Sequence, residues 1–183
     1  MSLGSAKASH TVKAAIDFAQ ENGTLVIAAS GNAQSAEPFY PAAYDGVIAV
    51  GATRMNNELW SLSNHGNYIT VVAPGDTIFS TAPNSSSSQL ELGSQSGTSM
   101  AAPYVAGLAG LLLSQDPNRT HEDLTRIIAR TATDLGDAGA DDQFGNGLIN
   151  VLEALNHVDA SGEIQGVSQP SEIQLHIPFV VQD

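Results

Sequence analysis

Three short runs of consecutive apolar residues constrain the fold of this 183-residue chain more than any other feature. They occupy residues 25–29 (LVIAA), 47–51 (VIAVG) and 69–73 (ITVVA), and all three are rich in β-branched side chains. A strand that is apolar on both faces must be covered on both faces, as the strands of parallel sheets are. The runs therefore predict a parallel sheet between layers of helices, which is an α/β fold.

Helical spacing of apolar residues separates and follows these runs. The pattern predicts helices at residues 9–22, 98–115, 120–132 and 148–155. Pro103 falls in the first turn of the second helix, where its missing N–H is tolerated. Thr120 and Asp123 resemble a capping box at the start of the third. A further short strand is predicted at 78–81, followed by a surface loop at the serine-rich residues 85–88.

The composition excludes several classes of protein. Six Lys and Arg against 19 Asp and Glu give a net charge of −13, so we expect neither nucleic acid nor an anionic membrane as a partner. The absence of Cys excludes disulfides, thiolate catalysis and Cys-ligated metals. The longest mostly apolar stretch, 100–113, is interrupted by Gly and Pro and is short for a membrane span. Residues 1–10 lack the pattern of a secretory signal.

The strongest chemical signal is the string GTSMAAPYVAG at residues 97–107. Ser99 lies where a long apolar helix is expected to begin. Free N–H groups and the positive end of the helix dipole at that place favour developing negative charge, which suits a serine that attacks a carbonyl. The alternative is that Thr98 or Ser99 only caps the helix.

The same string resembles the nucleophile signature of the subtilisin-like serine proteases. Other segments resemble that family in the same order along the chain: AASGN at 28–32, YPA at 40–42, VIAVGA at 47–52, VAPG at 72–75 and GNGLIN at 145–150. The resemblance covers roughly residues 1–156 and implies the C-terminal part of a subtilisin-like peptidase domain, an incomplete three-layer α/β fold. Residues 157–183 are interpreted as a tail or the start of a following segment.

The resemblance implies a serine endopeptidase that hydrolyses peptide bonds through an acyl-enzyme. Ser99 matches the nucleophile, and Asn32 matches the side chain that donates to the oxyanion. Thr98 is expected either to assist the oxyanion region or to cap the helix. The alternative for Asn32 is an ordinary turn residue after Gly31.

Two further segments match the family's substrate-binding elements. Ser2, Leu3 and Gly4 match the strand that pairs with the substrate backbone, where Gly4 would let a peptide approach closely. A second set, matching the wall of the first specificity pocket, comprises Ala29, Ser30 and Gly31. Ordinary strand and turn packing is the alternative for both segments. Tyr40-Pro41 aligns with a position where the family has a cis proline.

The base and the orienting carboxylate that such a serine needs have no counterpart in this sequence. In this family both precede the oxyanion segment, in Asp-Ser/Thr-Gly and His-Gly-Thr-His motifs. The chain has neither motif, and its histidines read as surface or loop residues: His10, His65, His121, His157 and His176. We therefore expect the triad Asp and His outside this chain, and little or no turnover by the isolated chain. The alternative is a catalytically inactive remnant that binds extended peptides by strand addition. A different α/β hydrolase fits poorly, because that family has Gly two residues after its serine, where this chain has Ala101.

The resemblance also sets expectations for partners and location. A peptide or protein substrate and the N-terminal part of the catalytic domain are the expected partners, and secretion is the family's common habit. No cofactor is expected. A structural Ca²⁺ is an alternative, either at the acidic pair Asp141-Asp142, which alone offers too few oxygen ligands, or on backbone carbonyls at residues 42–47.

Overall fold

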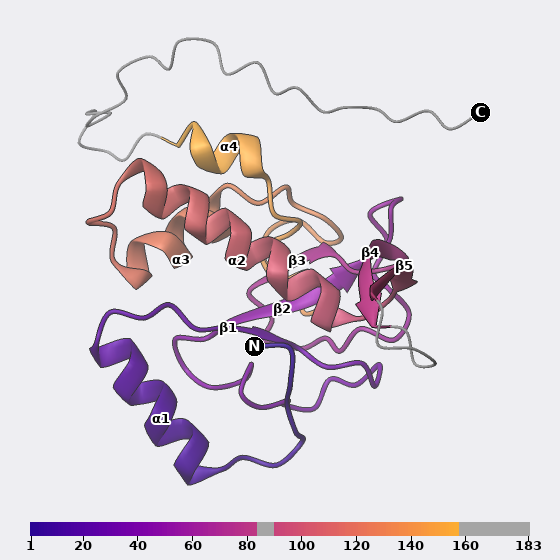
Figure 1. Cartoon of the computed structure of the whole chain (residues 1–183), viewed down its shortest axis with the longest axis horizontal. Helices are drawn as coiled ribbons and strands as arrows, with labels where there is room; N and C mark the ends of the chain where they lie inside the picture. The colour runs from indigo at the N-terminus through magenta and orange to yellow at the C-terminus, as the bar shows by residue number, and fades with distance from the viewer. Residues whose placement is uncertain (84–89, 158–183) are drawn as a thin grey trace.

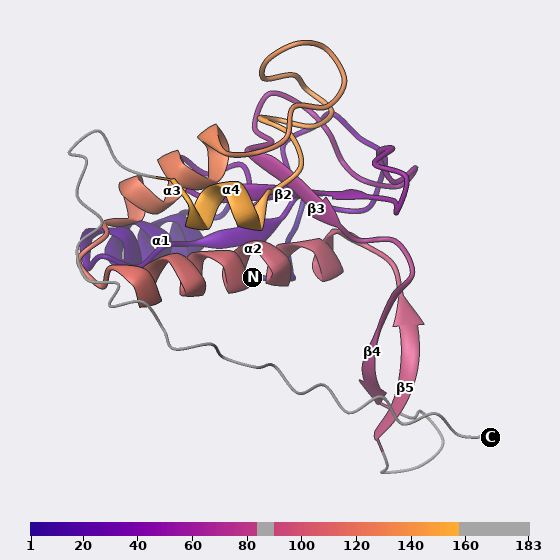
Figure 2. The same cartoon turned by 90° about the horizontal axis from the view of Figure 1, so that it is seen from above.

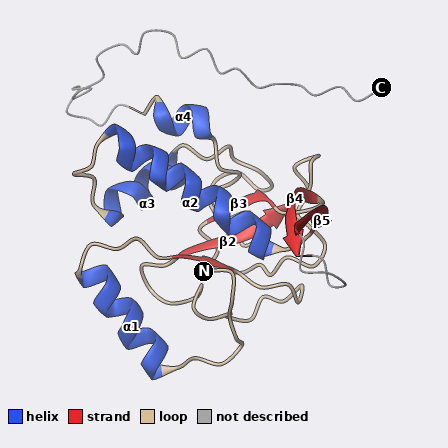
Figure 3. Ribbon diagram, in the orientation of Figure 1, coloured by secondary structure: helices blue, strands red, loops and turns tan. Residues whose placement is uncertain are grey.

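A parallel three-stranded sheet forms the centre of the molecule (Figures 1 and 3). The computed structural model describes residues 1–83 and 90–157. Strands β1 (Ile27–Ala29), β2 (Ile48–Thr53) and β3 (Val71–Pro74) lie in the order β1-β2-β3, and both pairings are parallel. The apolar runs thus form the expected sheet.

Helices cover both faces of this sheet, which confirms the α/β fold. Helix α1 (His10–Glu21) lies on one side, while α2 (Thr98–Gln115), α3 (His121–Arg130) and α4 (Val151–Leu155) lie on the other (Figure 1). Alternate residues of β1 pack into the two hydrophobic clusters on either side of the sheet. Ile27 and Ala29 pack with α2, α3 and α4, whereas Ala28 packs with α1. The largest fully buried side chains of the first cluster are Ile48, Leu108, Leu112, Leu124, Ile127 and Ile128.

Short backbone pairings extend the sheet at both edges. Beside β1, the Met1 carbonyl accepts from the Ala29 N–H at 3.0 Å. Beside β3, the Val72 N–H donates to the Gly147 carbonyl at 2.9 Å, and the Val72 carbonyl accepts from the Ile149 N–H at 3.0 Å. Some backbone N–H and C=O groups on the two edge strands are therefore hydrogen-bonded to residues outside the sheet.

The structure corrects the predicted elements in three places. The strand at 78–81 is one arm of an antiparallel hairpin, in which β4 (Ile78–Pro83) pairs with β5 (Leu90–Gln95); β5 was not predicted. The last helix begins at Val151 instead of 148, because Leu148 pairs with Val72 and Thr133. Helix α3 ends at Arg130 rather than 132. The predicted loop at 85–88 and the segment 158–183 lie outside the described residues.

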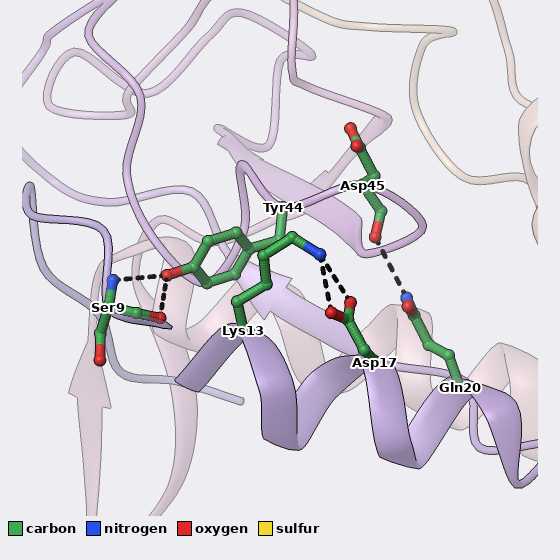
Figure 4. Close-up of polar contacts among 6 residues, drawn as sticks. All are labelled: Ser9, Lys13, Asp17, Gln20, Tyr44 and Asp45. Carbon is green, nitrogen blue, oxygen red and sulfur yellow. Dashed lines mark hydrogen bonds and ion pairs between the residues drawn. The ribbon is translucent and has the colours of Figure 1, made fainter. Parts of the chain in front are cut away.

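Helix α1 is fastened at its two ends to the loop before β2 (Figure 4). At its start, the Tyr44 hydroxyl accepts from the Ser9 N–H at 2.7 Å and donates to the Ser9 carbonyl at 2.9 Å. At its end, Gln20 Nε2 donates to the Asp45 carbonyl at 3.3 Å. Ile16 is the buried residue of this helix, whose other described residues are partly or largely exposed. The polar end contacts therefore supplement a small apolar contact.

The start of α3 generates a stability prediction. Thr120 Oγ1 accepts from the Asp123 N–H at 3.1 Å, and the Thr120 N–H donates to the Asp123 carboxylate at 3.1 Å, which is a complete capping box. Hydrogen bonds from Arg126 and then Thr120 hold the pKa of Asp123 below its usual range. Thr120→Ala should lower the free energy of unfolding by about 1 kcal/mol, measured by urea denaturation. Thr125→Ala, in the same helix but outside the cap, is the matched control, and an equal loss there would contradict the capping role.

Candidate active site

Helix α2 begins near the edge of the sheet at which the parallel strands end (Figure 1), and the candidate nucleophile Ser99 is its second residue. After β1 the chain turns at Gly31, whose φ of +106° suits glycine, and reaches Asn32. The chain enters α2 through Gly97, with a φ of +151°. A Cβ at Gly97 would lie 3.0 Å from Asn32 Nδ2, so the missing side chain lets the loop and the helix start come together.

Asn32 and Thr98 are joined by a side-chain network. Asn32 Oδ1 accepts from the Thr98 N–H at 2.9 Å and from Thr98 Oγ1 at 2.8 Å. Thr98 Oγ1 in turn accepts from the Gly31 N–H at 3.1 Å. Two donors converging on one atom fix which end of the amide is oxygen. The Asn32 Nδ2 group is therefore the end of the amide that faces away from Thr98. Because Asn32 is exposed, this orientation suits donation to a bound ligand.

This network replaces the ordinary cap of α2. The N-cap residue is Gly97, which has no side chain to bond the first N–H groups. Thr98 is already the first helical residue, and its own N–H is satisfied by Asn32. The alternative that Thr98 or Ser99 merely caps the helix is therefore wrong. Thr98 instead orients the amide of Asn32.

Ser99 is the second residue of α2 and is half-buried. Its carbonyl accepts from Ser2 Oγ at 2.9 Å, which brings the predicted substrate strand against the candidate nucleophile. N–H groups in the first turn of a helix have no intrahelical partner, so the Ser99 N–H is suited to donate to an anion. Hydrogen bonds thus join Asn32 to Thr98 and Ser2 to Ser99, from segments far apart in the sequence, and the catalytic roles of Ser99 and Asn32 stay predictions.

An apolar groove of about 610 Å³ begins at Ser99 and runs along α2. Its walls are the hairpin and the outer face of α2: Ile78, Phe79, Ser80, Thr81, Gly93, Gln95, Ser99, Met100, Pro103, Tyr104, Gly107, Leu108, Leu111 and Val151. None of these residues is Asp, Glu, His, Lys or Arg. Tyr104 and Leu111 are 45% and 47% exposed. A helix with apolar side chains on every face is usually buried on every face. The outer face of α2 is therefore an uncovered packing surface in the described part of the chain.

The predicted substrate strand has an internal packing role as well. A Cβ at Gly4 would lie 2.6 Å from the Tyr40 carbonyl, because the neighbouring Ser5 pairs with Tyr40 through two hydrogen bonds of 2.7 and 2.8 Å. The close approach of Gly4 to the Tyr40 carbonyl is enough to require glycine at this position, without any role in binding a peptide. Leu3 is 62% exposed beside it. The Tyr40-Pro41 peptide bond is cis. The role of residues 2–4 in binding a peptide stays a prediction.

The segment predicted to wall the specificity pocket is buried. Ala29 is 3% exposed and Ser30 is fully buried, with its Oγ 3.5 Å from the Asn64 carbonyl. Tyr68 donates to the Ser30 carbonyl at 3.2 Å, and burial raises the pKa of this phenol. The side chains of Ala29 and Ser30 thus belong to the core, and a role for this segment in a specificity pocket, through its backbone, stays a prediction.

The sequence analysis missed Asn64, which holds the loop that carries Asn32. Asn64 is 2% exposed. Its Oδ1 accepts from the N–H groups of Ala33 at 2.8 Å and Ser35 at 3.3 Å, and its own N–H donates to the Gly31 carbonyl at 2.9 Å. Asn64 thus bonds three backbone groups, two through its side-chain oxygen and one through its backbone N–H, and these bonds fix the path of the loop on both sides of Asn32. Only its position between a serine and the His65-Gly66 pair marks this residue in the sequence.

The acidic and histidine side chains lie elsewhere. His65 lines a separate cavity of about 310 Å³ together with Gln34 and Trp60. The Asp141 carboxylate accepts from the N–H groups of Gln143 at 2.7 Å and Phe144 at 2.8 Å, and so stabilises a turn. Within residues 1–83 and 90–157, no three His, Asp or Glu side chains gather as metal ligands. A Ca²⁺ on the carbonyls at 42–47 stays a prediction. In the same residues, no helix is both long and apolar enough to cross a bilayer.

Comparison with known proteins decides the family. A profile described as "Subtilase family" matches residues 1–147. The chain belongs to the subtilase family. It is 42% identical over 158 residues to subtilisin DY of Bacillus licheniformis, covering 84% of this chain and 55% of that protein. It is also 42% identical over 179 residues to the minor extracellular protease Epr of Bacillus subtilis, covering 97% of this chain and 27% of Epr.

Solved structures agree with the subtilisin-like fold. A protease from Pseudoalteromonas arctica superposes with a TM-score of 0.78 at 31% identity, over 85% of this subtilase chain and 49% of that one. The subtilisin-like protease Apa1 of an Antarctic Pseudoalteromonas superposes with a TM-score of 0.77 at 20% identity, over 88% of this chain and 70% of that one, which shows the fold alone. The subtilase chain thus spans about half the length of the curated subtilisin that it matches.

The network at Asn32 generates a second prediction. Thr98→Val keeps the shape of the side chain but removes the hydroxyl, which leaves the Gly31 N–H without its acceptor and removes one of the two donors to Asn32. We expect a loss of about 1–3 kcal/mol in the free energy of unfolding, and a shift of the Asn32 side-chain amide resonances in NMR spectra.

Thr98→Ser is the matched control, since it retains the hydroxyl. The orienting role of Thr98 would be wrong if the valine and serine variants unfolded at the same urea concentration and left the Asn32 amide resonances unchanged.

Proposed function

We propose that this chain is the nucleophile-bearing part of a subtilase serine endopeptidase, which cleaves peptide bonds through an acyl-enzyme on Ser99. The observation that carries the proposal is the Asn32 amide, whose oxygen is bonded twice by Thr98 at the residue next to Ser99. A module that only binds peptides has no need for an amide oriented in this way. The similarity of this chain to subtilisin DY and to the protease Epr also supports the proposed peptidase function.

Each residue of the site has a chemical task in this proposal. Ser99 Oγ attacks the carbonyl carbon of the scissile peptide bond, and the carbonyl oxygen becomes an oxyanion. In this proposal the Ser99 N–H and Asn32 Nδ2 donate to that oxyanion, and donors fixed before the reaction stabilise such charge as it develops. Removing such a donor costs ~10²–10³ in kcat, a magnitude that comes from subtilisin itself rather than from this structure.

The proton acceptor for Ser99 is proposed to come from outside this chain. The described residues that line the groove at Ser99 include no carboxylate and no imidazole, and a serine nucleophile needs a general base. The remaining part of the catalytic domain is the proposed source of both the His and the Asp. The uncharged, apolar walls of the groove suit a packed protein segment and would cost little to desolvate.

Three further points complete the proposal. The substrate is a peptide or protein, bound beside residues 2–4. The reaction as proposed needs no cofactor, because a serine, its base and two oxyanion donors suffice for acyl transfer. The site of action is extracellular, a proposal supported by the name of the relative Epr.

Labelling with a fluorophosphonate tests this function. The isolated chain should react slowly at Ser99, since subtilisin loses roughly 10⁶-fold in kcat without its histidine. Adding the N-terminal part of a subtilase catalytic domain, such as that of subtilisin DY, should accelerate the labelling of Ser99, which is followed by intact mass. Ser99→Ala must abolish it.

Two results would contradict the proposal in different ways. Rapid labelling of the isolated chain would place a base within it. A complementing fragment that binds, by size-exclusion chromatography, without accelerating the labelling of Ser99 would remove the nucleophile assignment.

The groove gives a separate prediction about binding of that fragment. Leu111→Glu puts a charge on the uncovered face of α2 and should weaken binding of the complementing fragment at least about tenfold, because a carboxylate would have to be buried without a partner. Phe18→Glu is the matched control: Phe18 is 69% exposed on α1, on the other side of the sheet. Equal effects of the two variants, measured by calorimetric titration, would show that the groove is not the contact surface.

A further inference from the structure

The sequence contains the dipeptide Asn-Gly twice, at Asn22-Gly23 and at Asn146-Gly147. Asparagine is among the thermally labile residues of proteins. In an Asn-Gly pair the backbone nitrogen of glycine can attack the side-chain amide of asparagine, because glycine offers no side chain to hinder it. The reaction needs the two residues to leave a fixed backbone conformation. The structure gives the two pairs opposite environments in this respect.

The first pair ends helix α1 and is exposed. Asn22 is the C-cap residue, and its Nδ2 donates to the Phe18 carbonyl at 2.7 Å. The Gly23 N–H donates to the Gln20 carbonyl at 2.9 Å, and Gly23 has a φ of +78° with open space where a side chain would be. These are last-turn hydrogen bonds, which open first when a helix frays.

The second pair is enclosed. The Asn146 N–H and Nδ2 both donate to the Thr70 carbonyl, at 2.9 and 2.8 Å. Gly147 is buried, donates to the Phe144 carbonyl at 2.9 Å and accepts from the Val72 N–H at the edge of the sheet. A Cβ at Gly147 would overlap the Thr133 carbonyl. Movement of this pair therefore requires part of the core to open.

We propose that Asn22-Gly23 is a site of spontaneous deamidation, and that Asn146-Gly147 is protected from it by the fold. The Gly23 backbone nitrogen forms a bond to Asn22 Cγ and loses its proton. The bond from Cγ to Nδ2 breaks and ammonia leaves, which gives a succinimide. Water then opens the ring to aspartate or to isoaspartate. Water is the only co-reactant, and no oxidation occurs.

The product weakens the end of α1. Deamidation removes the Nδ2 donor to Phe18 and places a carboxylate at the negative end of the helix dipole, next to Glu21. Isoaspartate also adds a methylene to the backbone at the C-cap. Gln20, which bonds the Asp45 carbonyl in Figure 4, lies in the same turn. The modification therefore loosens the polar contact that fastens this end of α1.

Incubation of the full chain at mildly alkaline pH, followed by digestion and mass spectrometry, tests the inference. The peptide containing Asn22 should gain the mass difference between NH₂ and OH at least about tenfold faster than the peptide containing Asn146, a ratio that corresponds to about 1.4 kcal/mol. In urea the two sites should react at similar rates. Gly23→Ala should slow only the first site, and Asn22→Gln should abolish its reaction.

The contradicting results are distinct. If Asn22 stays unmodified in the folded chain while both sites react in urea, the exposed cap is not a modification site. If Asn146 reacts as fast as Asn22 in the folded chain, the fold does not protect the second pair. Neither result depends on peptidase activity, so this test and the labelling of Ser99 succeed or fail separately.

Discussion

The contact between Asn32 Oδ1 and Thr98 is the interaction on which the candidate site depends. It joins the loop after β1 to the first residue of α2, across 66 positions of the sequence. One amide oxygen satisfies the start of the helix, and the same bonds turn the amide nitrogen outward. The position of Ser99 and the orientation of its neighbouring donor are therefore set by a single network, which Gly31 and Asn64 hold from the strand side.

The sequence predicts the parts of this architecture whose physics is local or repeated. Continuous apolar runs specify a buried parallel sheet, and an apolar helix beginning at Gly-Thr-Ser was predicted at 98–115, the bounds that α2 has. The sequence does not predict strand β5, because LELGSQ has no continuous apolar run. Its strand conformation depends on pairing with β4. Asn64 escaped prediction because its bonds reach residues about 30 positions away. The sequence also suggests Thr98 or Ser99 as the cap of α2, which is wrong for the same reason: the group that bonds the first N–H of the helix is Asn32, in a distant loop.

Helix α2 connects the core of the molecule with the proposed catalytic site. Its inner face packs on all three strands and on α3 and α4. Its outer face carries half-exposed Tyr104 and Leu111 beside the proposed nucleophile. One helix therefore supplies the central core, the start of the proposed catalytic machinery and an apolar surface of the kind that proteins cover. A nucleophile at the start of such a helix, as proposed for Ser99, would depend on the packing of the whole fold around that helix.

The hairpin of β4 and β5 stands away from the body of the molecule between β3 and α2 (Figure 2). Its base is clamped: the Gly97 N–H donates to the Gly75 carbonyl at 2.7 Å, the Thr77 N–H donates to Ser96 Oγ at 2.8 Å, and Ser96 Oγ donates to Asp76 at 2.8 Å. These bonds fix the base of the arm beside the start of α2, and residues 78–81 of the arm line the groove that also contains Ser99. A change confined to the outer part of such an arm would alter an exposed surface of the molecule while leaving this fastened base in place.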